Sequence, residues 1–227
     1  MRYDDTTLAE GKAANKASFQ RKMGLREDPN APIFFWPSRL DPIQKGPQLL
    51  TDILYRVVQK HRDKNLQIAV VANGPHQRHF HDVVNRHDLY GRVAVCDFDE
   101  SLSRRGYAAS DFILMPSLFE PCGLPQMIGP IYGSLPVAHD TGGLHDTVFP
   151  LDETANTGNG FLFNVFDSSG LLWGIDRAMD FWAQPVEKRN AQISRVMRES
   201  KARFNHGVCA QAYIDIYETM LNRALVK

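Results

Sequence analysis

The sequence lacks an excess of charge of either sign, long apolar runs and a cysteine framework. Lys and Arg together number 26, as do Asp and Glu, so the formal net charge is zero and neither a basic excess nor a basic stripe indicates a nucleic-acid partner. No apolar run approaches the ~20 residues of a membrane span, and the polar stretch 1–16 is unlike a signal peptide. Three widely spaced cysteines do not form a disulfide framework. We expect a soluble cytoplasmic protein without membrane or nucleic-acid partners.

Short apolar runs alternate with amphipathic stretches along most of the chain, and the 43 % hydrophobic content suffices for one sizeable core. Strands of four or five apolar residues bounded by turn residues are typical of a parallel sheet that is buried on both faces. The alternation predicts an α/β, doubly wound, Rossmann-like fold. We expect strands over 33–36, 68–72, 93–96, 112–115 and 135–138, a short apolar segment at 160–163, and helices over 46–62, 76–88, 100–109 and 123–132.

The two ends of the chain differ from this pattern. Residues 1–32 are charged and alanine-rich and predict a lead-in segment with a helix over 7–23, so the main domain is expected over 33–227. Its C-terminal part, from about residue 168, predicts three further helices over 168–183, 186–201 and 207–225. The last of these has an apolar stripe without reactive groups.

Ligands of such sheets lie beyond the carboxyl ends of the strands, so the residues that follow each strand are candidate contacts. The first strand is followed by Ser38 and Arg39, and Lys45 stands at the start of the next helix. Two cations beside a helix N-terminus suit a diphosphate. The spacing alone is equally compatible with two solvated surface charges.

Two later strand ends offer further candidates. After the fourth strand, Glu120 can accept hydrogen bonds from sugar hydroxyls or merely cap the helix, and Gly123 allows close approach to the backbone. After the fifth strand, Thr141 is a candidate N-cap, and Gly142 with Gly143 can expose backbone amides to an anion or simply form a tight turn.

Three other sequence patterns resemble functional sites, but we do not interpret them as such. Asp97-Phe98-Asp99 matches a metal-binding D-x-D motif, but it is short and falls in a turn after a strand, so we expect no metal there. The histidines at positions 76, 79 and 81 do not share one helix face and are expected to be solvated. Cys122 has no histidine near it in sequence, and packing is a better interpretation than a nucleophile.

Four stretches together resemble the C-terminal domain of bacterial glycogen synthases and plant starch synthases, a retaining GT-B glycosyltransferase family. They are YDDTTLAEGKAANKASFQRKMGL, the SRL…QKG pair, SDFILMPSLFEPCGLPQM and YGSLPVAHDTGGLHDTV, of which the third is the most specific. The resemblance covers essentially the whole chain. It implies a domain that binds ADP-glucose, and an enzyme that transfers the glucose to an α-glucan without a metal or another cofactor.

The resemblance also assigns roles to residues. Arg39 and Lys45 would neutralise the departing ADP diphosphate, and Glu120 would contact the glucose hydroxyls without acting as a covalent nucleophile. Phe98 would pack on adenine, which is a further reason to discount the D-x-D motif. The remaining expected contacts are Ser38, the backbone of Cys122, Gly123 and Leu124, and the cleft residues Thr141, Gly142 and Gly143.

The sequence departs from the family pattern in several places. Members have an N-terminal domain that contributes a catalytic-site histidine and most of the acceptor surface, and this chain begins at the expected interdomain segment, so it would need that domain as a partner. The Arg39–Lys45 interval is one residue longer than expected, Leu118 replaces a frequent arginine, and His139 and Asp140 replace basic residues. These changes make the cleft less positive and leave the donor choice open.

Two other functions remain open. The chain could be a non-catalytic module that binds a sugar nucleotide or a partner and kept the fold, an alternative that the absence of the N-terminal domain sustains. It could also be a different GT-B enzyme, such as a sucrose-type synthase or an epimerase, against which E-P-C-G-L argues. If another domain covers the cleft, the exposed face there should be unusually apolar.

Overall fold

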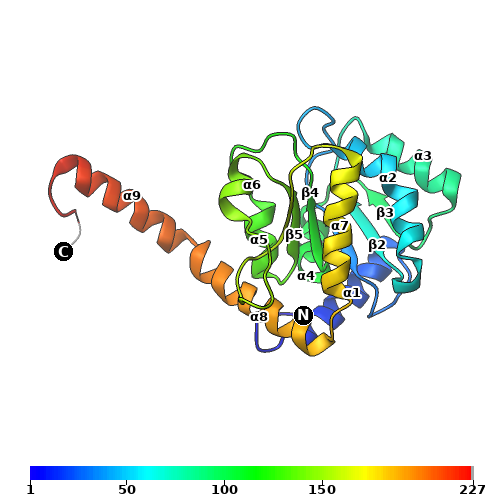
Figure 1. The fold of residues 1–227 in the computed structure, drawn as a ribbon, viewed down its shortest axis with the longest axis horizontal. Helices are drawn as coiled ribbons and strands as arrows, with labels where there is room; N and C mark the ends of the chain where they lie inside the picture. Colours follow the sequence, from blue (N-terminus) through cyan, green and yellow to red (C-terminus); the bar gives the residue numbers. More distant parts are fainter. Residues whose placement is uncertain (226–227) are drawn as a thin grey trace.

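The computed structural model describes residues 1–225 as a three-layer α/β fold (Figure 1). Six parallel strands form one sheet in the order β3-β2-β1-β4-β5-β6. The strands are β1 Ile33–Trp36, β2 Gln67–Val71, β3 Val93–Cys96, β4 Phe112–Met115, β5 Leu135–His139 and β6 Phe161–Phe163. This arrangement confirms the predicted doubly wound fold and makes the short apolar segment at 160–163 the edge strand.

Helices cover both faces of the sheet. The described helices are α1 Leu8–Met23, α2 Pro47–Lys60, α3 Gln77–His87, α4 Glu100–Ala109, α5 Pro125–Ile131, α6 Gly142–Thr147, α7 Ser168–Trp182, α8 Val186–Arg203 and α9 His206–Leu221, with a 3-10 turn η1 at Arg62–Lys64. Most helix bounds agree with the sequence predictions within one or two residues. The expected helix at 123–132 begins later, at Pro125, and the expected 207–225 helix ends earlier, at Leu221.

The period of two in β1 divides the core between the two faces. Phe34 and Trp36 face one layer, where they pack with residues of α2, α3 and α7. Ile33 and Phe35 face the opposite layer, where Phe35 meets Phe19 of α1 edge-on at 6.1 Å between ring centroids. All residues of β1 are fully buried, which explains why this strand is continuously apolar rather than alternating.

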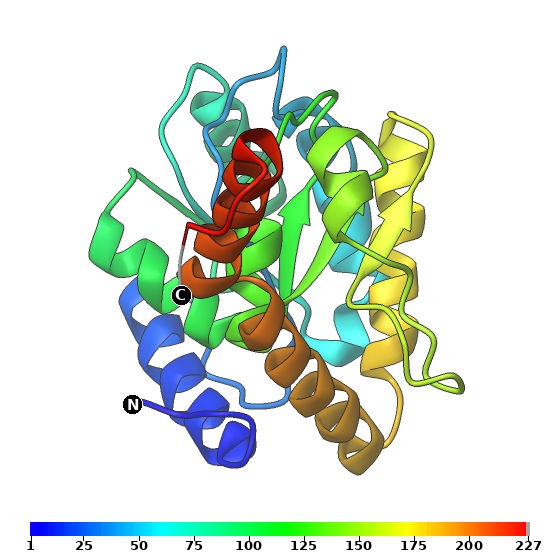
Figure 2. The same cartoon turned by 90° about the vertical axis from the view of Figure 1, so that its left-hand side faces the viewer.

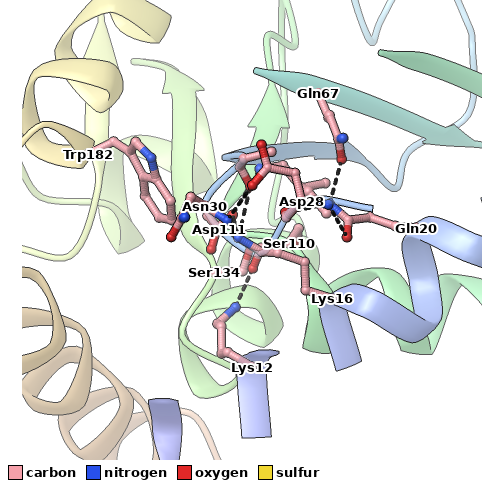
Figure 3. A network of polar contacts seen from close by, with 12 residues as sticks. Lys12, Lys16, Gln20, Asp28, Asn30, Gln67, Ser110, Asp111, Ser134 and Trp182 are labelled. Carbon is pink, nitrogen blue, oxygen red and sulfur yellow. Dashed lines mark hydrogen bonds and ion pairs between the residues drawn. The ribbon is translucent and has the colours of Figure 1, made fainter. Parts of the chain in front are cut away.

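A buried polar network attaches α1 beneath the amino ends of the strands (Figure 3). The Lys16 ammonium pairs with Asp111 at 2.7 Å and donates to the Ala31 carbonyl at 2.9 Å. Asp111 also accepts from the Ile33 amide at 2.9 Å, so one carboxylate holds α1, β1 and the start of β4 together. The Lys12 ammonium donates to the Ser110 carbonyl. Helix α1, which was expected in a lead-in segment, is therefore packed into the body of the fold by this network.

The last helix differs from all the others because none of its residues is buried. In Figure 1, α9 projects from the body beyond α8, and Figure 2 shows it from its end. Its exposed apolar side chains include Val208, Tyr213, Ile216, Tyr217 and Met220. No helix among residues 1–225 has both the length and the apolar content to cross a membrane.

Candidate donor-binding site

The carboxyl ends of β1, β2 and β3 surround a cavity of about 690 Å³. Its lining brings together three of the residues singled out in the sequence: Ser38, Arg39 and Phe98. The Phe98 ring is 53 % exposed, although an aromatic ring normally lies buried in a core. The cavity therefore combines a guanidinium with an accessible aromatic face, which suits a ligand with both a planar and an anionic part.

Backbone contacts between two strand ends hold Ser38 and Arg39 in place. The Trp36 indole donates to the Ser38 carbonyl at 2.7 Å, and the Leu40 amide donates to the Asn73 carbonyl at 2.9 Å. A Cβ on Gly74 would come within 2.5 Å of the Leu40 carbonyl oxygen, so this close approach requires glycine. The segment is thus fixed to the loop after β2 rather than free in solvent.

A turn around Asp41 then directs the chain to Lys45. The Asp41 carboxylate accepts from the amides of Ile43 and Gln44, at 2.9 and 3.3 Å, and the Lys45 amide donates to the Asp41 carbonyl at 2.8 Å. Such side-chain-to-backbone bonds are typical of an Asx turn. This turn sets the path of the chain between Arg39 and Lys45.

Lys45 and Glu120 form a mostly buried ion pair between the ends of β1 and β4. Their side chains are 13 % and 7 % exposed, and the Glu120 carboxylate also accepts from the Ser117 hydroxyl at 3.2 Å. Glu120 therefore does not cap the following helix: the N-cap residue of α5 is Leu124, and no side chain bonds to the free amides there. The capping interpretation is wrong because the lysine, although distant in sequence, is the nearer partner.

Gln44 connects the two parts of the site. Its amide oxygen accepts from the Arg39 guanidinium at 3.3 Å, and its backbone carbonyl accepts from the Leu118 amide at 2.8 Å. The cavity wall and the loop that holds Glu120 are thus joined through a single residue. Nothing in the sequence indicates this role for Gln44, since a glutamine in a loop between two cations is usually a solvated amide.

The loop 120–124 presents its backbone to solvent. Gly123 has φ +75°, a left-handed conformation, and a Cβ there would meet the Gln126 side chain at 2.5 Å. Among residues 1–225, no protein acceptor pairs with the backbone amides of Cys122, Gly123 and Leu124. Cys122 itself is exposed, and its thiol contacts only the Gly123 carbonyl, at 3.4 Å.

The loop 141–143 packs directly against loop 120–124. The Gly143 amide donates to the Glu120 carbonyl at 2.7 Å, so this amide is not free for an anion in the present conformation. A Cβ on Gly142 would overlap the Glu120 carbonyl oxygen, and one on Gly143 would overlap the Cys122 carbonyl oxygen. The two glycines thus allow close contact between the loops, and Thr141 precedes α6 without a side-chain cap bond.

Gln126 strengthens the same contact from inside. This fully buried side chain donates to the carbonyls of Cys122 and Gly123, at 2.8 and 3.1 Å, and to the Thr147 hydroxyl of α6 at 3.1 Å. Its amide oxygen is buried without a partner among the described residues. A glutamine in the first turn after E-P-C-G-L is the sequence signal that could have suggested this role.

Side chains of the D-x-D motif and of the histidine cluster, which we did not interpret as sites, bond to other protein groups. Asp99 caps α4 by accepting from the Leu102 amide at 2.6 Å, and Asp97 accepts from Gln77 at 2.9 Å. The rings of His76 and His79 stack at 4.3 Å, and His76 bonds to Thr51, so His76 is less solvated than expected. Within residues 1–225, no three His, Cys, Asp or Glu side chains are grouped as metal ligands.

Comparison with known proteins gives consistent similarities. Residues 31–180 match the family model described as glycosyl transferases group 1. The chain is 36 % identical over 219 residues to a glycogen synthase of Bacillus subtilis (strain 168) and 38 % identical over 219 residues to one of Exiguobacterium sibiricum, with 95 % of this chain covered in both. It spans only 43 % of either relative.

A solved structure adds similarity in three dimensions. The catalytic domain of starch synthase IV from Arabidopsis thaliana, bound to ADP and acarbose, superposes with a TM-score of 0.81 at 32 % identity. The match covers 98 % of this chain and 45 % of that one. The present fold therefore corresponds to slightly less than half of the plant domain.

Proposed function

Because the chain belongs to the family of glycosyl transferases group 1, we propose that it is the donor-binding domain of a glycogen or starch synthase. Joined to an N-terminal domain, it would transfer glucose from ADP-glucose to the non-reducing end of an α-glucan, with retention at the anomeric carbon. The names of its relatives support this choice over a non-catalytic module.

The observation that carries the proposal is the buried Lys45–Glu120 pair beside the aromatic cavity. In the proposed complex, adenine stacks on Phe98, and Arg39 and Lys45 contact the diphosphate. Glu120 faces the glucose hydroxyls, with Ser38 and the free amides of loop 120–124 beside the sugar and phosphate. Loop 141–143 supports that wall of the cleft. The exposure of Arg39 and Phe98, and the amides of loop 120–124 without an acceptor among the described residues, support these roles.

The proposed chemistry follows from where charge develops. Breaking the anomeric bond places negative charge on the departing ADP and positive character on glucose. The two fixed cations stabilise the first, and the proposal assigns this role to them rather than to a metal. Glu120 already accepts bonds from Lys45 and Ser117, an arrangement that suits an orienting carboxylate better than a nucleophile.

The proposal also requires partners beyond this chain. The relatives are more than twice as long as the matched region, which supports a further domain that completes the cleft. Exposed apolar side chains surround the carboxyl ends of the strands, as expected of a surface that another domain covers; they are Ile43, Phe98, Leu118, Phe119 and Leu124. We place the acceptor glucan between the two domains.

Calorimetric titration with ADP, ADP-glucose and UDP-glucose tests the donor site. Arg39→Ala is the variant, since among residues 1–225 this exposed side chain bonds only to Gln44 and its loss should not disturb folding. Arg198→Ala, which removes an exposed guanidinium on α8, is the matched control. We expect adenine-selective binding that weakens about tenfold in Arg39→Ala, the loss of one charge-assisted hydrogen bond, and is unchanged in the control. Equal affinity for all three ligands, or equal affinity of variant and wild type, would contradict the proposal.

A further inference from the structure

A second candidate site lies outside the donor cleft, on the outer side of α7. Of the three tryptophans, Trp36 is fully buried and Trp182 is covered by Arg189 at 3.9 Å, whereas Trp173 is 53 % exposed. Leaving a large indole in water forfeits the free energy that its burial would supply, at about 25 cal/mol per Å². An exposed tryptophan on a helix that packs against the sheet is therefore a feature that requires an explanation.

Two grooves meet at the Trp173 ring, with volumes of about 360 and 340 Å³. Both volumes fall within the range of ligand sites in proteins, roughly 300–1,000 Å³. The first is lined by residues that follow β6, including Asn164, Val165 and Asp167. The second is lined by the segment before β6 and by the end of α7. Together they follow the edge strand of the sheet, which Figure 2 shows with α7 at one flank of the molecule.

Helical spacing places polar groups next to the ring. Ser169, Trp173 and Arg177 are four residues apart and share one face of α7. The Arg177 guanidinium lies 6.0 Å from the Trp173 ring centroid and pairs with Asp180. The ring is thus an apolar platform with hydrogen-bonding groups around its edge.

The chemistry of this lining selects among ligands. Three carboxylates, of Glu153, Asp167 and Asp180, line the two grooves beside a single guanidinium, of Arg177, so a polyanion such as a nucleic acid would be repelled. A purely apolar ligand would take water away from these charged groups, of which Arg177 and Asp180 are more than half exposed, without offering hydrogen bonds in return. A pyranose ring has an apolar C–H face that stacks on an indole, and peripheral hydroxyls that bond to carboxylate, amide and guanidinium groups.

We propose that the groove along β6 and α7 is a non-catalytic binding site for an α-1,4-linked glucan chain, with Trp173 as its stacking platform. The choice of an α-glucan among sugars rests on the proposed function. The groove ends at the loop 164–167, whose Phe166 ring lies 5.3 Å from the His139 ring and close enough to Gly46 that a Cβ there would meet it at 3.2 Å. This loop therefore reaches the rim of the donor site, and a chain held in the groove would keep the polymer close to the cleft.

Calorimetric titration with maltohexaose and retardation in glycogen-containing gels test this site in the full chain. We expect Trp173→Ala to weaken both at least tenfold and Trp173→Phe to weaken them less, because a smaller aromatic platform remains. Tyr55→Ala is the matched control: it removes a side chain of similar exposure, 44 %, from α2, away from the groove, and should behave as wild type.

Several results would overturn the inference: no retardation of the wild type, equal retardation of Trp173→Ala, or equal affinity for maltohexaose and cellohexaose. ADP titration of the same proteins separates this inference from the donor site. Trp173→Ala should bind ADP as the wild type does, and Arg39→Ala should retain maltohexaose. If the wild type does not bind ADP but binds the glucan in a way that depends on Trp173, the result contradicts the proposed donor site and leaves the glucan site standing.

Discussion

At the scale of single residues, the donor site is built around two opposite charges that the fold removes from water together. Burying one charge without its partner costs several kcal/mol, whereas a matched pair roughly offsets its own desolvation. Lys45 and Glu120 come from loops after different strands, so their pairing also couples β1 to β4. Under the proposed function the same two residues would serve both binding and stability, so single substitutions should affect both.

Lys45→Ala should lower the free energy of unfolding by about 3 kcal/mol, because it leaves the Glu120 carboxylate buried without its cation. Adding Glu120→Gln should recover a large part of that loss, since a neutral amide costs less to bury. Urea unfolding of both variants and the wild type measures the difference. If the double variant is less stable than Lys45→Ala, the buried charge is not the cause.

Lys12 gives the fold a dependence on pH. Burial, opposed by Asp111 and assisted by Lys16, lowers the pKa of its ammonium from 10.5 to about 7. Between these values the unfolded chain binds a proton that the folded chain does not, so stability rises as the pH increases through this window. Below about pH 7 both states are protonated, and the cost of the buried charge is fully present.

We therefore expect the free energy of unfolding to rise from pH 7 to pH 9, and to rise less in Lys12→Met, in which no buried amine titrates. Denaturant unfolding across this range measures the slope. Lys22→Met, at an exposed position of the same helix, is the control and should keep the wild-type slope. If stability rises more steeply with pH in Lys12→Met than in the wild type, the pKa of Lys12 is not lowered by folding.

At the scale of elements, the wall of the donor cleft consists of two loops that behave as one unit. Loop 120–124 and loop 141–143 share the bond from the Gly143 amide to the Glu120 carbonyl, and Gln126 bonds to both the first loop and α6. Neither loop can shift without breaking contacts of the other. A change far from the ligand can therefore displace the groups that face it.

Gly143→Ala should destabilise the fold by about 1–3 kcal/mol, the usual cost of overpacking, because the new Cβ meets backbone rather than a flexible side chain. It should also weaken ADP-glucose binding by displacing loop 120–124. Thermal unfolding and calorimetry measure the two effects. Gly207→Ala, where the nearest atom is the Asn205 side-chain oxygen at 3.1 Å, should change neither.

The elements differ in how far the sequence predicts them. Apolar runs bounded by turn residues indicate the strands closely, because central strands such as β1 and β4 are buried on both faces and have no polar alternation to obscure them. For the short helix α6 the sequence indicates only the N-cap residue, Thr141, because six residues contain too little of a helical period to predict its extent. The order of strands in the sheet depends on contacts between distant segments, which the pattern of one sequence does not reveal.

The same limit applies to the candidate site. The rule that ligands lie beyond strand ends indicates Arg39, Lys45 and Glu120, and the family resemblance adds Phe98; the structure places these residues at one edge of the sheet. It does not indicate that Lys45 pairs with Glu120, or that Gln44 and Gln126 connect the loops. Those contacts join residues that are 75 positions apart or have no distinctive neighbours in sequence.

At the scale of the whole molecule, α9 contributes length without contributing to the core. None of its residues is buried, and its N-cap bond, from the Val208 amide to Asn205, is local. The tyrosines at 213 and 217 stack on each other at 6.5 Å rather than on another element. Its apolar side chains are the kind of surface that a monomer rarely exposes as one patch.

A chain that ends at Phe204 should therefore unfold with the same free energy as the full chain, within about 0.5 kcal/mol, since none of the removed residues up to position 225 is buried. It should also be more soluble, because the exposed apolar stripe is lost. Equilibrium unfolding in urea and light scattering at increasing concentration measure these outcomes. A loss of stability above about 1 kcal/mol would mean that α9 packs on the body in solution.

The parallel sheet separates two kinds of residue in space. The network of Lys12, Lys16 and Asp111 lies at the amino ends of the strands, and the candidate ligand groups lie at the carboxyl ends. Substitutions at the carboxyl ends can therefore change the choice of nucleotide or sugar during evolution without altering the polar network at the amino ends.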